Sequence, residues 1–382
     1  MSSTARGPAT GDEDTVAEIM RRGGVELRER MLRTEEHLER VAAEAGVPLA
    51  VHATSTVLAG GKRLRPLLVV LAATAAAGSD GPRDAAAGSD RQSDPAAGSD
   101  RQRDAESDGG VQAGPLDTEE GERSLVRAAV AVELVHSATL VHDDVIDGAQ
   151  LRRGRPSVVA QAGRRAAIAT GDLLFSRAFA ELTRNADVAQ LRALSDASSA
   201  LAVGELLQRE DAYAPRVAVE RYLRRCELKT AALFEAACRL GALVARGSDR
   251  SAGALADALG AFARRIGLAF QLLDDVLDVS GPVERTGKTR GTDLLDGTVT
   301  LPLILARERD ERLAAIDLGS LSTPEQADEL CERIAATGAL EEARERALTL
   351  VAEAKAMLPA ILPNGNAALL DLVADAVVER YR

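Results

Sequence analysis

Apolar residues recur every three or four positions through most of this chain, with charged residues between them. The stretch 17–45 is one example. Leu27, Met31 and Leu38 follow the helical spacing there, and glutamate and arginine fill the gaps. This period predicts amphipathic helices, because residues three and four apart share one helix face. No stretch shows the alternation bounded by turn residues that is typical of strands, so we expect an all-α protein.

The same pattern predicts a series of further helices. They are expected to begin near Leu64 and to cover 124–147, 160–185, 190–210, 215–245, 252–280, 301–310, 325–360 and the stretch from Ala367 onward. Pro66 fits the first turn of the helix near Leu64, because its missing N–H has no intrahelical partner to lose there. Helices of these lengths fit a single helical bundle domain around a central cavity.

A ten-residue repeat interrupts the helical pattern. AAAGSD occurs at 75 and 85, and PAAGSD at 95. Large apolar residues are scarce from about 78 to 123, so this segment cannot bury enough surface to offset the entropy lost on ordering it. We expect a disordered insert at about 78–123 within one domain that covers 17–382. The polar residues 1–16 are expected to be a disordered lead.

Composition and charge exclude several classes of function. The net charge of −12 and the low aromatic content of 2% argue against nucleic-acid binding. Three cysteines without metal-ligand spacing favour a reducing, cytoplasmic location. No stretch approaches about 20 consecutive apolar residues, so no transmembrane helix is expected. The first residues lack the apolar core of a signal peptide.

Two acidic pentads of the form DDxxD lie in predicted helices, and each is flanked by apolar residues (LVHDDVID and FQLLDDVLD). The first and last Asp of a pentad are four apart, so their carboxylates share one helix face. Such a concentration of like charge is costly unless a cation is bound. Oxygen ligands without a Cys or His donor set favour Mg²⁺ over zinc. We therefore expect several Mg²⁺ ions around a diphosphate, held by Asp143, Asp147, Asp274 and Asp278.

Positive charges accompany the pentads along the chain. GGKRLRP at 60–66 surrounds a predicted helix start, where backbone N–H groups favour phosphate. RRGRP at 152–156 follows the first pentad, and Lys288 lies in the glycine-rich loop after the second. Lys229 interrupts an apolar helical stretch, and His136 shares the helix face of the first pentad. Each alone is more often a solvated or core residue, but together with the carboxylates they suit a metal-bridged diphosphate.

Six ordered motifs resemble those of the trans-isoprenyl (polyprenyl) diphosphate synthases. They are GGKRLRP, LVHDDVIDGAQLRRGRPSV, GDLLFSRAF, ELKTAALF, FQLLDDVLDVSG and GKTRGTDLLDGTVTLPLI. The match runs from about Ala17 to the end of the chain, apart from the repeat insert. The resemblance implies an all-helical bundle, usually a homodimer. It also implies Mg²⁺ as cofactor and two substrates, isopentenyl diphosphate and an allylic prenyl diphosphate.

The resemblance assigns roles to matching positions. It implies that isopentenyl diphosphate is bound by Lys62, Arg65, His136 and Arg153. It implies that the allylic diphosphate is bound by Arg152, Lys229, Thr230, Gln271 and Lys288. Thr298 stands where many members of the family carry lysine, and this departure puts one allylic contact in doubt.

The residues before the first pentad bear on product length. Ala138 and Thr139 lie about one turn before Asp143. Small side chains there leave room for a growing prenyl chain, so the sequence looks like the long-chain subgroup that extends farnesyl or geranylgeranyl diphosphate for quinone side chains. Alternatively, Ala138 only packs against a neighbour and a deeper side chain limits the product.

Two other functions compete with the synthase. A class I terpene cyclase would be expected to carry a different second metal motif and more aromatic residues. A non-catalytic subunit of a heteromeric synthase would be expected to lose acidic residues, yet both pentads are intact. Transient membrane contact is expected for release of a long lipid product.

Overall fold

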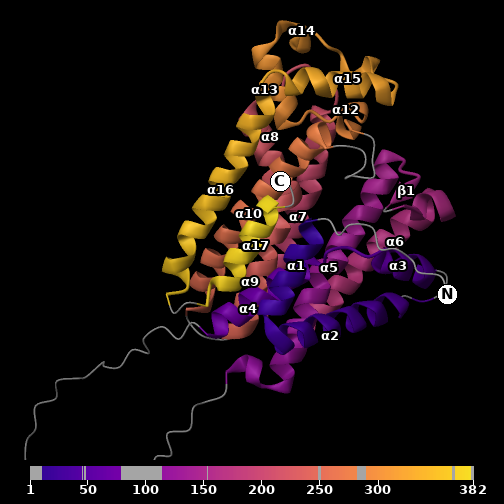
Figure 1. Cartoon of the computed structure of the whole chain (residues 1–382). Helices are drawn as coiled ribbons and strands as arrows, with labels where there is room; N and C mark the ends of the chain where they lie inside the picture. The colour runs from indigo at the N-terminus through magenta and orange to yellow at the C-terminus, as the bar shows by residue number, and fades with distance from the viewer. Residues whose placement is uncertain are drawn as a thin grey trace, which may run out of the picture.

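The computed structural model describes residues 11–44, 46, 49–78, 114–152, 154–247, 251–281, 290–363 and 366–379. These parts of the chain are almost entirely helical, which confirms the predicted all-α class (Figure 1). The exception is a short antiparallel pair, β1 (Leu151–Arg152) and β2 (Arg155–Pro156), which the sequence pattern did not predict. Gly154 turns this hairpin with a positive φ of 73°.

The helices of the first half include α5, which carries the first acidic pentad at its C-terminal end. They are α1 (Gly11–Arg22), α2 (Gly24–Ala43), α3 (Leu49–Leu58), α4 (Leu64–Ala77), the 3-10 turn η1 (Pro115–Asp117), α5 (Glu119–Asp147), α6 (Val158–Thr183) and α7 (Val188–Asp211). Among these, α3 was not predicted. The predicted helix 17–45 is divided at Gly23 and Gly24, where Gly24 takes a positive φ of 72°.

The second half carries the second pentad and the C-terminal helices. It comprises α8 (Val219–Cys226), the π-helical turn η2 (Glu227–Ala231), α9 (Ala232–Arg246), α10 (Ala252–Ser280), α12 (Thr292–Leu295), α13 (Leu301–Arg309), α14 (Glu311–Ala314), the 3-10 turn η3 (Leu318–Ser320), α15 (Pro324–Ala335), α16 (Ala339–Ile361) and α17 (Ala368–Glu379). The predicted helix 325–360 is divided at Gly338, which has a positive φ of 75°.

Helical structure extends into two segments for which the composition predicted disorder. Helix α5 begins at Glu119, within the predicted insert, because Thr118 caps it by accepting a hydrogen bond from the Gly121 N–H. Residues 79–113, the remainder of that insert beyond Gly78, lie outside the described residues. Helix α1 likewise begins at Gly11, within the predicted lead 1–16, of which residues 1–10 are not described.

Helix α5 packs against α2, α4, α6 and α9 (Figure 1). By length and apolar composition alone it could cross a membrane, which the sequence did not predict, but 72% of its most apolar window is buried in the fold. Helix α10 packs against α9 and α16, so the two pentads lie on helices that share α9 as a neighbour.

A buried ionic contact fixes the start of α4. Arg63 precedes this helix in the left-handed region, with φ of 47°, and its guanidinium contacts Glu35 at 2.5 Å and Glu133 at 2.7 Å. Glu133 is 3% exposed, and Arg63 also donates to the Val57 carbonyl at 2.8 Å. The middle cation of GGKRLRP is therefore structural, because an unpaired Glu133 carboxylate would be costly in this interior.

Helices α4 and α9 approach closely at Gly241. A Cβ atom on Gly241 would lie 2.2 Å from the Val69 carbonyl oxygen and 2.9 Å from the Ala73 nitrogen. Gly253, in the first turn of α10, has open space instead, with no atom within 4 Å of the position that an added Cβ would take. The two glycines therefore form a matched pair for testing how much the close approach matters.

We predict that Gly241→Ala lowers the free energy of unfolding by about 1–3 kcal/mol, because the backbone of α4 must move to make room. Gly253→Ala should leave that free energy equal or slightly higher, since alanine favours the helix. Urea denaturation followed by circular dichroism measures both. Equal stability of the two variants would show that α4 and α9 do not depend on this close approach.

Candidate active site

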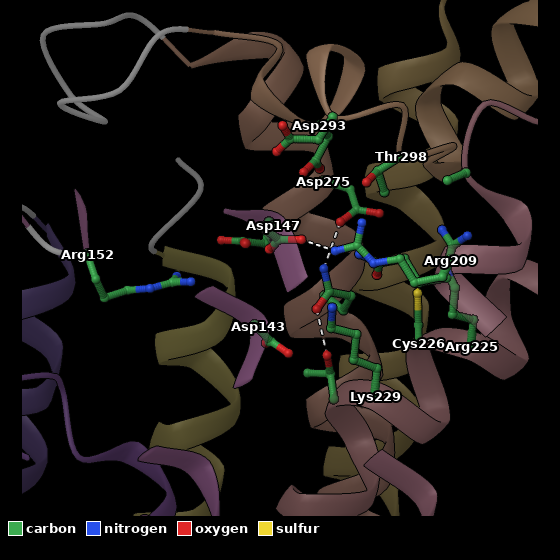
Figure 2. A pocket seen from close by; sticks show the side chains of 16 residues that line it. Asp143, Asp147, Arg152, Arg209, Arg225, Cys226, Lys229, Asp275, Asp293 and Thr298 are labelled. Carbon is green, nitrogen blue, oxygen red and sulfur yellow. Dashed lines mark hydrogen bonds and ion pairs between the residues drawn. The ribbon is translucent and has the colours of Figure 1, made fainter. Parts of the chain in front are cut away.

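A cavity of about 280 Å³ opens between α5, α7, α8, η2, α10 and the segment around α12 (Figure 2). Most of its lining side chains are polar or charged. Seven residues predicted from the sequence meet here, and they come from distant parts of the chain and from both acidic pentads. They are Asp143, Asp147, Arg152, Lys229, Thr230, Gln271 and Asp274. The remaining lining residues are Gln208, Arg209, Ala212, Arg225, Cys226, Asp275, Asp293, Asp296 and Thr298.

The first pentad divides its carboxylates between the cavity and the protein interior. Asp143 and Asp147 are four apart on α5 and both line the cavity (Figure 2). Asp144, the next residue, points elsewhere because consecutive helical residues face different directions. It is 3% exposed and accepts hydrogen bonds from Arg152 at 2.8 and 2.5 Å. The hairpin residue Arg152, predicted to bind the allylic diphosphate, is thus anchored to the first pentad.

The second pentad is held by its neighbours in a similar way. Asp274 lines the cavity, whereas Asp275, at the cavity wall, is 4% exposed and is held by two side chains. The Tyr222 hydroxyl donates to it at 2.6 Å and the Gln271 amide at 2.8 Å. Thr230 in turn donates to the Gln271 side-chain oxygen at 2.7 Å. Thr230 and Gln271, both predicted to bind substrate, therefore also fix the position of the second pentad.

Asp278 is placed differently from the other three predicted metal ligands. It is not among the described residues that line the cavity, and its carboxylate accepts the Asp293 N–H at 3.2 Å. Its backbone carbonyl accepts the Gly291 N–H at 2.8 Å. In this structure Asp278 thus holds the start of α12, and it is Asp293 and Asp296 that reach the cavity. Its role as a metal ligand stays a prediction.

The π-helical turn η2 presents Lys229 and Thr230 to the cavity. Such turns insert one extra residue and commonly occur at functional sites. Helix α7 approaches this turn closely, because a Cβ atom on Gly204 would lie 2.5 Å from the Lys229 nitrogen. Lys229 forms an ion pair with Glu205, the residue after that glycine. The close approach of the two helices therefore positions the lysine.

Several lining residues were not identified from the sequence. Arg209 of α7 pairs with Asp147. Arg225 of α8 pairs with Asp211 at 3.3 Å and donates to the Val299 carbonyl at 2.7 Å. Both arginines lie on helices without a recognisable charged motif. Asp293 of α12 and Asp296 at its end did carry a signal, since GTDLLDG lies within the last of the six ordered motifs.

Burial raises the pKa of carboxyl groups in this cavity. Burial raises the pKa of Asp143 to about 6, although Lys229 and Arg152 oppose this shift. The pKa of Asp293 lies well above its usual value, first because of burial and then because of the charges on Asp278 and Asp275. The cavity therefore favours any ligand that brings positive charge to these oxygens.

Other predicted residues lie away from this cavity or outside the described residues. Lys62 is exposed, His136 is half-buried on α5, and the Arg65 guanidinium lies 5.1 Å from the Phe234 ring centroid. None of the three is among the described lining residues. Two further residues, Arg153 and Lys288, are not described. The isopentenyl diphosphate assignments therefore stay predictions.

The two residues assigned to product length differ in their surroundings. Ala138 is fully buried, four residues before His142, whose ring stacks on Phe175 of α6 at 5.8 Å between centroids. Ala138 thus lies on the face of α5 that meets α6. Thr139 is half-buried and lies four residues before Asp143, on the cavity side.

The carboxylates fit Mg²⁺ that is shared with a substrate better than a cage made only of protein ligands. No group of three His, Cys, Asp or Glu side chains within the described ranges is close enough to hold a metal ion. Mg²⁺ usually binds one or two carboxylates and completes its shell with water and substrate phosphates. Carboxylates on separate walls of one cavity suit that arrangement.

Known proteins share both sequence and architecture with this chain. The polyprenyl synthetase family model matches residues 48–336. Geranylgeranyl diphosphate synthase of Methanosarcina mazei is 36% identical over 68% of this chain and 80% of its own length. Heptaprenyl diphosphate synthase component 2 of Geobacillus stearothermophilus is 36% identical over 74% of this chain and 73% of its own length.

A solved structure agrees with these relatives. Polyprenyl synthase from Caulobacter crescentus, in complex with calcium and isoprenyl diphosphate, superposes with a TM-score of 0.74 at 30% identity. The alignment covers 99% of each chain. Together with the six motifs, these matches show that the chain belongs to the polyprenyl synthetase family.

Proposed function

We propose that this protein is a trans-polyprenyl diphosphate synthase, which condenses isopentenyl diphosphate head-to-tail with an allylic diphosphate. The observation that carries this proposal is the cavity where Asp143 and Asp147 of α5 meet Asp274 of α10 beside Lys229 and Arg152. Carboxylates and cationic side chains in this arrangement suit a diphosphate bridged by metal ions. The family match and the relatives' names support the same reaction.

Mg²⁺ is the cofactor that the donor set supports, and Asp143, Asp147 and Asp274 would hold it. When bound, it neutralises charge on the departing diphosphate. The calcium in the Caulobacter crescentus structure supports a divalent cation in this family. Asp278 is not included in this set of metal ligands, because its carboxylate accepts the Asp293 N–H.

The protein side chains orient and stabilise the allylic substrate. Lys229 and Arg152 bring positive charge to the cavity, where it favours departure of the diphosphate. Thr230 and Gln271 keep Asp275 in place through their hydrogen bonds. The isopentenyl double bond must then lie against the allylic carbon, so orientation dominates the rate.

The product is a long all-trans chain, made from a farnesyl or geranylgeranyl primer for quinone side chains. The small side chains at Ala138 and Thr139 support this, as does the heptaprenyl relative. The geranylgeranyl relative favours a shorter product at comparable identity.

The assembly and the location of the protein are proposed from the resemblance, the relatives and the cysteines. The resemblance supports a homodimer, whereas the relative named component 2 supports a heteromeric synthase. All three cysteines are buried and unpaired, which suits a reducing cytoplasm. Transient membrane contact would serve release of a long product.

We predict that the chain purified alone elongates farnesyl or geranylgeranyl diphosphate with labelled isopentenyl diphosphate, and that a chelator abolishes this until Mg²⁺ is restored. Sizing of the extracted prenyl alcohols measures the product.

Asp143→Asn should lower the turnover rate on the order of 100-fold, because it removes a carboxylate facing the diphosphate. Asp196→Asn, an exposed change on α7, is the control. A chain inactive alone but active with an added component would support the heteromeric alternative.

The sequence predicts that Ala138→Phe shortens the product; in the structure Ala138 is fully buried on the face of α5 that meets α6, so the ring would reach the growing chain by displacing that contact. Thr139→Phe is the second variant, since Thr139 lies on the cavity side and Ala138 has no exposed surface. Product sizing is paired with urea denaturation to show that each variant is folded. Unchanged product length in both folded variants would place the limit at another side chain.

A further inference from the structure

Four described residues that line the cavity carry positive charge, and each forms an ion pair with an acid. They are Arg152, Arg209, Arg225 and Lys229. Three of the partner acids have side chains only 5%, 6% and 13% exposed, and none of them is a proposed metal ligand: Asp144, Asp211 and Glu205. Those pairs can persist when a metal binds, so they hold their cations in place.

The partner of Arg209 is different. Asp147 is a proposed metal ligand, and the two side chains are 38% and 42% exposed, so their ion pair stabilises the fold little. A metal ion and a guanidinium compete for the same carboxylate. Figure 2 shows the Arg209 side chain reaching across the cavity to Asp147. Metal binding at Asp147 would leave this guanidinium beside the metal-bound diphosphate.

We propose that Arg209 is a diphosphate-binding residue, released from Asp147 when the metal binds; this inference rests on the proposed function. Its Nε lies 3.4 Å from Glu205, which keeps the side chain on the cavity wall. Thr298 lines the same cavity without charge, at the position where the resemblance leads one to expect lysine. Arg209 thus supplies from α7 the positive charge that Thr298 does not.

The test measures binding without turnover. The probe is farnesyl S-thiolodiphosphate, which ionises slowly, titrated calorimetrically with Mg²⁺ present. Arg209→Leu should weaken its affinity about tenfold, the loss of one charge-assisted contact. Adding Thr298→Lys to that variant should restore most of the affinity. Arg192→Leu, an exposed change on the same helix, is the matched control and should bind as the unaltered protein does.

A second titration separates this role from simple support of Asp147. Mn²⁺ affinity without diphosphate should be equal or higher in Arg209→Leu, because the competing guanidinium is gone. Unchanged affinity for the thiolodiphosphate, or a parallel loss of Mn²⁺ affinity, would overturn the inference. If Arg209→Leu lost affinity for the thiolodiphosphate and Thr298→Lys did not restore it, the idea that Arg209 supplies the charge missing at Thr298 would be overturned. An unaltered protein that does not bind the probe would contradict the proposed function itself.

Discussion

Repulsion among carboxylates at one end of the bundle is the constraint on which the site depends. Asp143 and Asp274 face a common cavity; Asp144 is buried away from it, and Asp275 lies in its wall with only 4% of its surface exposed. Arg152 donates a hydrogen bond to Asp144, and Tyr222 and Gln271 donate hydrogen bonds to Asp275. The helical period makes this division possible, because neighbouring residues of DDxxD point in different directions.

Close approach of helices places the cations that oppose this charge. Gly204 lets α7 lie against the π-helical turn that carries Lys229, and Gly241 lets α9 lie against α4. Gly241 does not line the cavity, but its contact with α4 fixes α9, the helix that continues from the π-helical turn η2. Packing and electrostatics are therefore joined, since a shift of α9 would move Lys229 relative to the first pentad.

The arrangement suits a substrate that brings its own metal ions. The carboxylates do not converge on a single protein-only metal site within the described ranges. A diphosphate with Mg²⁺ would bring positive charge to Asp143, whose pKa burial raises to about 6. The site is therefore best completed by its ligand, which is consistent with a reaction in which charge develops on a departing diphosphate.

The sequence alone determined the fold class, the family and the positions of both pentads, because helical period and ordered motifs are local properties of a chain. It also identified Lys229, Thr230, Gln271 and Arg152, which the structure brings to one cavity. It did not reveal that Asp278 holds the start of α12, and it missed Arg209 and Tyr222. Those contacts have no local signal, because the partners of Arg209 and Tyr222 are distant in sequence. Only tertiary packing decided which polar side chains face the cavity and which hold it in shape.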